Sequence, residues 1–210
     1  MRALIIANGE GPSKDLVRAL RDAVDTVIAA DGGADVALAA GVVPDFVVGD
    51  LDSVSEAARL RIAAERFHLD ADPEATDLQT TIRFAIEKGA SEVDIVAWGG
   101  GRADHALANL SVLVMFRGLA KIRLVDDAFE VSLVDGSASV SAAIGTVVSI
   151  VAIGPCTGVT TTGLRWNLED EPLSFSPRGI HNEVASSPAT VSVLAGNLLL
   201  FRGRWVEKHR

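Results

Sequence analysis

The sequence predicts an α/β protein: an N-terminal Rossmann-like domain, in which a parallel sheet carries helices on both faces, and a C-terminal antiparallel β-sandwich domain. In the first part of the chain, short apolar runs alternate with helical patterns, as in strands joined by crossover helices. From about Ile122 the helical periodicity ends, and short β-rich runs recur between Gly, Ser, Thr and Pro turns. We expect the domains to span residues 1–125 and 126–210, with a short connection near 125–128.

Four apolar runs are expected to form strands of the parallel sheet, at residues 3–7, 26–30, 46–48 and 93–98. None of them alternates between apolar and polar residues. This pattern is typical of strands that are covered on both faces.

Helical patterns lie between and after these strands. The first follows Ser13, a suitable N-cap, and places an apolar stripe on one face. Further helices are expected at residues 34–40, 54–66, 76–88 and 104–117. The stripe residues expected to face inward in the first and last helices are Leu16, Ala19, Leu20, Ala23, Leu107, Leu110, Leu113 and Val114.

The second domain is expected to contain six short strands. They are predicted at residues 129–134, 147–153, 158–162, 173–176, 190–195 and 198–201. The last two strands are separated by Gly196-Asn197, a pair typical of a tight hairpin turn.

Composition narrows the possible functions. A net charge of -9 argues against a general nucleic-acid binder, which normally carries a basic face. The single cysteine, Cys156, excludes an intramolecular disulfide and a thiolate metal site, and a cytoplasmic setting fits this best. No run approaches the roughly 20 apolar residues that a membrane-spanning helix needs, so no membrane association is expected.

Aspartates follow two of the predicted strands. Asp31 comes directly after one, and Asp50 and Asp52 come after the next. If that strand continues, Asp50 and Asp52 point to the same side and can approach one hard cation such as Mg²⁺. The alternative is that they form a turn and cap the following helix.

Two helix starts combine capping residues with residues suited to phosphate. Thr76 and Asp77 are natural caps, yet a helix N-terminus also binds phosphate. Residues 99–101 are three glycines after a buried strand, which let a ligand approach the backbone, and Arg102 can bind phosphate oxygens bidentately. The alternative for this second segment is a tight turn with Asp104 as the N-cap.

Two tryptophans are interpreted differently. Trp98 is expected to pack in the core. Trp166 lies in a polar context and either stacks on a flat ring or packs in the core.

Taken together and in order, residues 30–34, 44–53, 75–78 and 100–109 resemble the thiamine pyrophosphokinase family. Residues 163–168 and 178–184 look like that family's C-terminal thiamine-binding signatures, so the resemblance covers nearly the whole chain. The sequence departs from the pattern at His181, where the family often has serine.

The resemblance implies a homodimer that transfers the pyrophosphoryl group of ATP to the hydroxyl of thiamine, with each site lying between subunits. It implies an Mg²⁺ and phosphate centre formed by Asp31, Asp50, Asp52 and Asp77. The implied nucleotide or phosphate contacts are Asn8, Gln79, Arg102 and Asn109. Asp104 and His105 would lie near the transferred group or thiamine, and Trp166, His181 and Asn182 would bind thiamine. The catalytic carboxylates would be Asp50, Asp52, Asp77 and Asp104, and the choice of proton acceptor between Asp77 and Asp104 stays open.

Two other functions compete with this one. The first is pyrophosphoryl transfer to another heterocyclic alcohol, such as a hydroxymethylpterin. The second is a non-catalytic nucleotide sensor in which the β domain is an interaction module.

Overall fold

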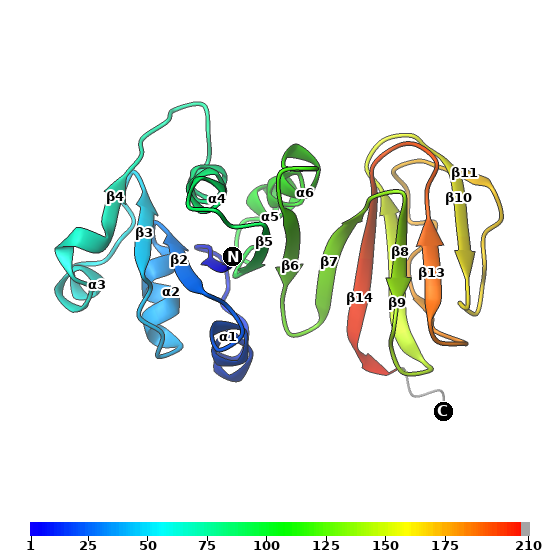
Figure 1. Ribbon diagram of the computed structural model, residues 1–210, viewed down its shortest axis with the longest axis horizontal. Helices are drawn as coiled ribbons and strands as arrows, with labels where there is room; N and C mark the ends of the chain where they lie inside the picture. Colours follow the sequence, from blue (N-terminus) through cyan, green and yellow to red (C-terminus); the bar gives the residue numbers. More distant parts are fainter. Residues whose placement is uncertain (207–210) are drawn as a thin grey trace. The chain divides into compact units, whose positions relative to one another are not determined.

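The computed structural model describes residues 1–206, and the chain divides into two compact units, Met1–Asp127 and Ala128–Arg210. The first unit is a parallel sheet with helices on both faces, and the second consists of two antiparallel sheets (Figure 1). The predicted fold class is therefore confirmed.

Six parallel strands form the sheet of the first unit, in the order β6-β5-β1-β2-β3-β4. The strands are β1 (Arg2–Ile6), β2 (Thr26–Ala30), β3 (Phe46–Gly49), β4 (Phe67–Leu69), β5 (Glu92–Val96) and β6 (Lys121–Val125). Strands β1 to β4 follow one another outward, and the chain then returns to place β5 on the other side of β1. This reversal of strand order leaves a crevice at the carboxyl ends of β1 and β5, where open α/β sheets bind ligands.

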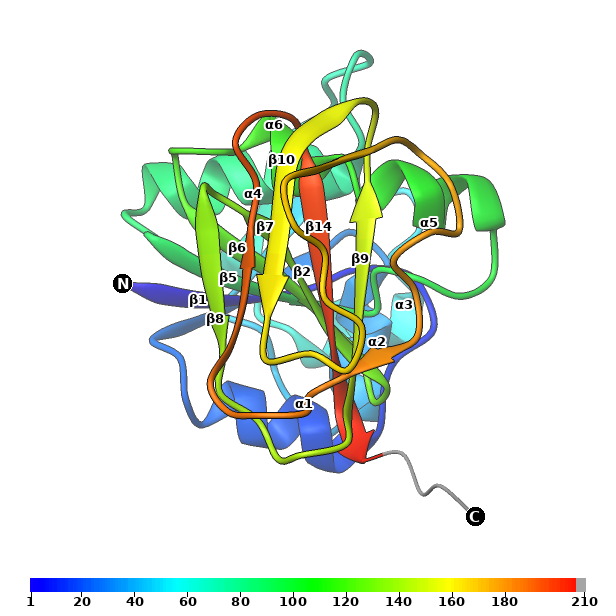
Figure 2. The same ribbon diagram turned by 90° about the vertical axis from the view of Figure 1, so that its right-hand side faces the viewer.

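Helices cover both faces of this sheet. They are α1 (Lys14–Arg21), α2 (Gly33–Ala39), α3 (Glu56–Arg61), α4 (Asp77–Glu87), α5 (Ala103–Asn109) and α6 (Val112–Met115). Figures 1 and 2 show α4, α5 and α6 on one side of the strands and α1, α2 and α3 on the other. Leu4 and Ile6 of β1 pack against Leu16 and Val17 of α1, which explains why the strand is apolar throughout.

Three helix predictions for this unit need correction. The predicted helix at 54–66 ends at Arg61, because Ile62 is extended and the chain then forms the short helix η1 (Ala64–Arg66) and the edge strand β4. The predicted helix at 104–117 is divided into α5 and α6, and Leu107 is 59% exposed rather than buried. In α1, Val17 is buried while Ala19 is exposed. Ser13 is the N-cap residue, as predicted, but its hydroxyl donates to Asp127 and makes no capping hydrogen bond.

The second unit is a two-layered sandwich. Its strands are β7 (Phe129–Val134), β8 (Ser137–Val140), β9 (Thr146–Ala152), β10 (Cys156–Thr162), β11 (Glu171–Leu173), β12 (Asn182–Glu183), β13 (Ala189–Ser192) and β14 (Leu198–Val206). One layer has the order β12-β9-β14-β7 and the other β11-β10-β13-β8, with antiparallel pairing throughout. Figure 2 shows β8, β13 and β10 in front of β7, β14 and β9. Residues from both layers, including Cys156, Val159, Leu198 and Leu200, form one core.

The predicted hairpin at Gly196-Asn197 is wrong. Strand β13 pairs with β10 and β8, whereas β14 pairs with β7 and β9, so the turn carries the chain from one layer to the other. A Cβ at Gly196 would lie 2.5 Å from the carbonyl oxygen of Pro155. The glycine is therefore required by close packing at this crossover rather than by a hairpin.

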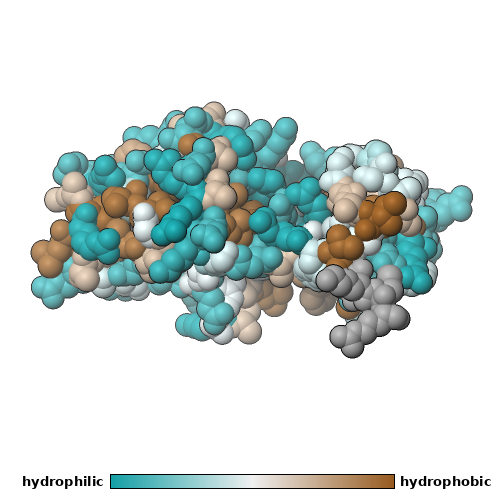
Figure 3. Space-filling model, turned by 90° about the horizontal axis from the view of Figure 1, so that it is seen from below, coloured by the Kyte–Doolittle hydropathy of each residue, from teal (hydrophilic) through white to brown (hydrophobic). Residues whose placement is uncertain are grey.

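The surface of the first unit is mainly hydrophilic on the face shown in Figure 3. Hydrophobic side chains are visible between the hydrophilic ones. Within residues 1–206, no helix has both the length and the apolar character needed to cross a bilayer.

The close contact between the start of α2 and the end of β1 can be tested by mutation. A Cβ on the buried Gly33 would lie 2.0 Å from the carbonyl oxygen of Ile6 at the end of β1. We expect Gly33→Ala to lower the free energy of unfolding by about 1–3 kcal/mol or more, because backbone must move to relieve the overlap. Gly99→Ala is the matched control, since no atom lies within 4 Å of its added methyl. Equal stability of both variants in urea unfolding would contradict this account of the packing.

Candidate functional site

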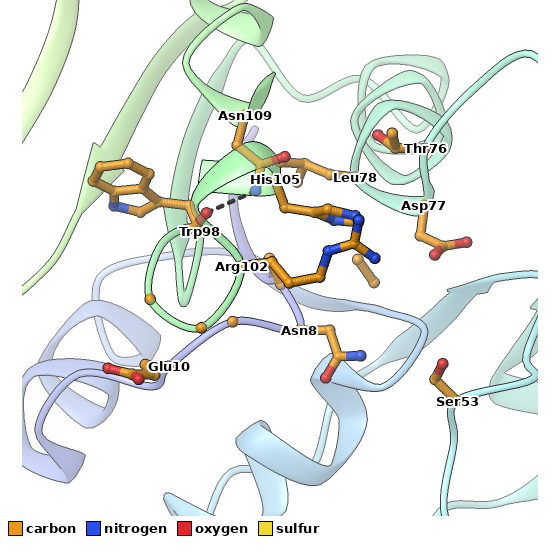
Figure 4. A pocket seen from close by; sticks show the side chains of 15 residues that line it. Asn8, Glu10, Ser53, Thr76, Asp77, Leu78, Trp98, Arg102, His105 and Asn109 are labelled. Carbon is orange, nitrogen blue, oxygen red and sulfur yellow. Dashed lines mark hydrogen bonds between the residues drawn. The ribbon is translucent and has the colours of Figure 1, made fainter. Parts of the chain in front are cut away.

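A pocket of 680 Å³ lies in the crevice that the sheet topology predicts. It is lined by the loops after β1, β2, β3 and β5 together with the N-terminus of α4 and part of α5 (Figure 4). Its side chains that carry polar groups include Asn8, Glu10, Ser53, Thr76, Asp77, Arg102, His105 and Asn109. Five of the predicted site residues, Asn8, Asp77, Arg102, His105 and Asn109, are therefore brought together.

The loops after β1 and β5 run beside each other at the floor of the pocket. Gly9 N donates to Ala97 O at 2.8 Å, and Glu10 N donates to Gly99 O at 2.8 Å. A Cβ at Gly9 would lie 2.3 Å from the oxygen of Gly99, so only glycine fits at this close approach. The glycines after the first strand thus hold the two loops together.

A capping box fixes the start of α4. The Thr76 hydroxyl accepts from Gln79 N at 3.3 Å, and the Gln79 side chain accepts from Thr76 N at 2.8 Å. The amide nitrogen of Gln79 donates to the sulfur of Met115 at 3.2 Å. In this structure Gln79 thus positions the first turn of α4, which carries Asp77.

Three carboxylates meet beside the pocket. Asp31 follows β2, Asp50 follows β3 and Asp77 begins α4, and one oxygen of each lies within 4.8 Å of the others. Gly49 makes this approach possible, because a Cβ there would lie 2.8 Å from an oxygen of Asp77 and 2.9 Å from Cβ of Asp31. Asp31 also has a positive φ of 44°, an uncommon conformation for a residue other than glycine.

Burial and mutual repulsion govern the charge of this cluster. Asp31 is 2% exposed, and burial raises its pKa, with smaller contributions from the charges of Asp50 and Asp52. Burial also raises the pKa of Asp77, followed by the charge of Asp31. One oxygen of Asp31 accepts from Ser53 N at 3.2 Å, whereas the other is buried without a hydrogen-bond partner among the described residues.

The donor set suits a hard divalent cation. Carboxylate oxygens are the ligands that Mg²⁺ prefers, and a cation would satisfy the buried oxygen of Asp31 and offset the repulsion within the cluster. The residues present therefore fit the metal that the sequence predicts.

Asp52 stands apart from this cluster. The condition that the strand continues through Asp50 and Asp52 is not met, because β3 ends at Gly49 and Leu51 has a φ of 65°. Asp52 N instead donates to Asp50 Oδ1 at 3.1 Å. Its carboxylate accepts from the hydroxyl of Ser53 at 2.8 Å. Asp52 therefore positions Asp50 through its backbone.

Arg102 and Asp104 form an exposed ion pair at the start of α5. Arg102 Nε lies 3.1 Å from Asp104 Oδ1, and Arg102 Nη2 lies 2.6 Å from Asp104 Oδ2. These hydrogen bonds lower the pKa of Asp104 to about 2. The guanidinium extends into the pocket, as Figure 4 shows, so its charge is already shared with a carboxylate.

The second unit contains a smaller pocket of 240 Å³ with mainly apolar walls. Trp166 and Asn182 both line it, and two hydrogen bonds join them: Asn182 Nδ2 donates to Trp166 O at 2.6 Å, and Trp166 N donates to Asn182 Oδ1 at 3.2 Å. The Trp166 ring is 57% exposed, with the Arg165 guanidinium 4.9 Å from its centre, so it is not a core residue.

His181 precedes Asn182 but is absent from the described lining of this pocket. Its φ is 58°, and its backbone nitrogen donates to the hydroxyl of Ser149 at 2.9 Å. The structure thus assigns His181 a turn conformation.

Sequence reasoning missed several residues of the larger pocket. Trp98, which was expected in the core, lines the pocket and is only half-buried. Glu10 also lines it, and a Cβ at Gly100 would lie 2.5 Å from the Glu10 side chain. The signal that could have found Glu10 is its place between two glycines directly after the first strand.

Comparisons with known proteins agree on one family. The model described as "Thiamin pyrophosphokinase, catalytic domain" matches residues 17–124, and that described as "Thiamin pyrophosphokinase, vitamin B1 binding domain" matches residues 138–198. The chain is 31% identical to thiamine pyrophosphokinase of Bacillus subtilis over 185 residues, covering 83% of this chain and 86% of that protein. It is 30% identical to thiamine pyrophosphokinase 3 of Oryza sativa subsp. japonica over 168 residues, covering 73% of this chain and 63% of that relative.

Solved structures show the same fold. The crystal structure of thiamine pyrophosphokinase from Bacillus subtilis matches with a TM-score of 0.83 and 28% identity, covering 97% of this chain and 99% of the other. Thiamin pyrophosphokinase from Candida albicans matches with a TM-score of 0.82 at 12% identity, covering 98% and 90% of the two chains, which supports the fold alone. The chain therefore belongs to the thiamine pyrophosphokinase family of enzymes.

Proposed function

We propose that this chain transfers the pyrophosphoryl group of ATP to the hydroxyl of thiamine, giving thiamine diphosphate and AMP. The main observation in support of this proposal is that the carboxylate cluster adjoins the 680 Å³ pocket, since Asp77 belongs to both. Family membership supports the identity of the two substrates. We assign ATP to the α/β domain at residues 1–125 and thiamine to the β domain at residues 126–210.

The larger pocket suits a nucleotide. Its glycine loops bring backbone close to a ligand, and Asn8, Arg102 and His105 offer hydrogen-bond donors to phosphate oxygens. In this structure the side-chain oxygen of Gln79 accepts from Thr76 N in the helix cap, and its nitrogen donates to Met115. A contact between Gln79 and the nucleotide stays a prediction.

Asp31, Asp50 and Asp77 would hold Mg²⁺, and Asp52 would support the site through Asp50. The cation would neutralise charge on the phosphates, which a bare carboxylate cluster would repel. Direct coordination by Asp52 stays a prediction.

Attack by an alcohol needs a group that takes its proton. Asp104, with a pKa of about 2, is a poor acceptor near neutral pH. Burial raises the pKa of Asp77, but Mg²⁺ bound to the same carboxylate would lower it, so neither carboxylate is assigned as the acceptor.

The smaller pocket suits a flat aromatic ring. Trp166 offers an exposed ring face, and its hydrogen bonds with Asn182 hold the backbone at that position. His181 stays a predicted contact. The family resemblance further suggests a homodimer in which Trp166 and Asn182 of a second copy complete each site, and the single cysteine suggests a cytoplasmic setting.

A product assay tests the reaction directly. With purified protein, ATP, Mg²⁺ and thiamine, we expect equal amounts of AMP and thiamine diphosphate, separated from ADP and thiamine monophosphate by chromatography. Excess EDTA should abolish both products, since the phosphate charge is then no longer offset. Undiminished turnover in EDTA, or ADP as the nucleotide product, would contradict the proposal. Product formed only when hydroxymethylpterin replaces thiamine would assign the alternative acceptor.

Asp31→Asn should separate the metal's role from folding. The pKa of Asp31 is higher in the folded than in the unfolded chain, so stability falls as the pH rises from its ordinary value near 3.8 through the raised one. At pH 7 we expect the variant to melt higher than the wild type without metal, by about 2–4 °C for each kcal/mol of repulsion relieved. Its stabilisation by Mg²⁺ should be lost, and kcat should fall about 100-fold or more.

Asp15→Asn is the control for this measurement, because the Asp15 side chain is 97% exposed on α1. Scanning calorimetry at pH 7, with and without Mg²⁺, gives the readout. An Asp31→Asn variant that melts lower than the wild type in EDTA and keeps its stabilisation by Mg²⁺ would show that Asp31 is a structural carboxylate.

Trp166→Ala should raise the KM for thiamine by about tenfold while changing kcat little, because ring stacking binds the ground state and the transition state alike. Trp205→Ala is the matched control, since Trp205 is a partly exposed tryptophan that packs on Phe129 outside the smaller pocket. Steady-state kinetics at saturating ATP measures both. An unchanged KM for thiamine in Trp166→Ala would assign the ring to another role.

A further inference from the structure

Asn109 presents a hydrogen-bond acceptor of fixed orientation to the larger pocket. It is the last residue of α5, and its side-chain nitrogen Nδ2 donates to Trp98 O at 2.7 Å. A backbone carbonyl can only accept, so the carboxamide must turn its nitrogen toward Trp98. Figure 4 shows the amide oxygen turned away from Trp98 toward Leu78.

This orientation is costly to reverse. A rotated carboxamide would place its oxygen against the oxygen of Trp98, leaving two acceptors facing each other and the Trp98 carbonyl without its donor. Asn109 is restricted to ligand groups that donate.

The position of Asn109 separates it from the end of the pocket suited to phosphate. Arg102 precedes α5 and Asn109 ends it, so the rise of the helix sets their Cα atoms about 10 Å apart, with His105 one turn before Asn109. Figure 4 shows Asn109 and Trp98 on one side of the pocket and Asp77 and Ser53 on the other. A nucleotide with its phosphates near Asp77 and Arg102 would therefore direct its base toward Asn109.

We propose that Asn109 determines the base specificity of the enzyme by accepting a hydrogen bond from the exocyclic 6-amino group of a purine. The inference rests on the proposed function in one respect, that a nucleotide occupies this pocket. A 6-oxo purine would bring a carbonyl oxygen to the oxygen of Asn109 and leave both unpaired. Ribose hydroxyls can also donate to this acceptor, so a contact with the ribose is the alternative that the test must distinguish from a contact with the amino group.

The test compares three nucleotides that differ at position 6 of the purine: ATP, inosine triphosphate and purine riboside triphosphate. On the wild-type protein we expect kcat/KM to be about 10–100-fold higher for ATP than for either analogue. In Asn109→Leu this ratio should fall to near one, mainly through a loss with ATP. Asn8→Leu is the matched control, because Asn8 lies in the same pocket after β1 and should affect all three nucleotides alike.

Calorimetric titration of AMP and IMP, without thiamine or Mg²⁺, keeps this inference distinct from the proposed reaction. Tighter binding of AMP that depends on Asn109 would support base selection even if no product formed with any acceptor. If Asn109→Leu fails to fold, Asn109→Ser serves as the second variant, with the same loss of the preference for ATP expected.

Equal use of ATP and inosine triphosphate by wild-type protein would overturn the inference. So would an Asn109→Leu variant that loses activity equally with all three nucleotides, since the residue would then act only through the fold. A variant that instead stops distinguishing ATP from 2′-deoxy-ATP would show a ribose contact and would equally refute selection at position 6.

Discussion

The repulsion among Asp31, Asp50 and Asp77 is the constraint on which the first unit depends. Three carboxylates with oxygens within 4.8 Å of one another oppose folding unless protons or a cation intervene. Backbone pairing in the sheet and the burial of apolar side chains outweigh this repulsion. Asp31 N donates to Val48 O at 2.8 Å, which joins the ends of β2 and β3, and the buried Thr81 and Ile82 hold α4 against the sheet. The cluster is thus assembled by backbone pairing and apolar burial.

Much of this arrangement follows from local sequence. The end of β2 at Ala30 and a cap at Thr76 or Asp77 were predicted because each depends on nearby residues, an apolar run in one case and residue types typical of an N-cap in the other. The structure shows Thr76 as the cap, within a capping box. That Asp31 and Asp50 lie on one sheet edge follows from the rule that parallel strands present their carboxyl ends together. The resemblance to a family added the expected order of the motifs.

Other features depend on contacts between distant residues. The edge strand β4 forms because Phe67 and His68 pair with Val47 and Val48, and no local pattern distinguishes it from the end of a helix. The positive φ of Leu51, which turns Asp52 away from the direction of a continued strand, is equally invisible in a pattern of alternating residues. Trp98 was misjudged because a tryptophan after a buried strand suits a core as well as a pocket wall.

The ion pair of Arg102 and Asp104 also affects how phosphate can bind in the pocket. Asp104 occupies Nε and Nη2 of the guanidinium, the same face that would bind a phosphate bidentately. A phosphate that binds this face must displace the carboxylate of Asp104 while it approaches the carboxylates around Asp77. Both steps oppose a bare polyphosphate, and both become favourable when a divalent cation accompanies it, because the cation offsets the charge of the cluster and of the phosphates together. We therefore expect the nucleotide and its cation to bind as a unit, with the exposed ion pair opening as they enter.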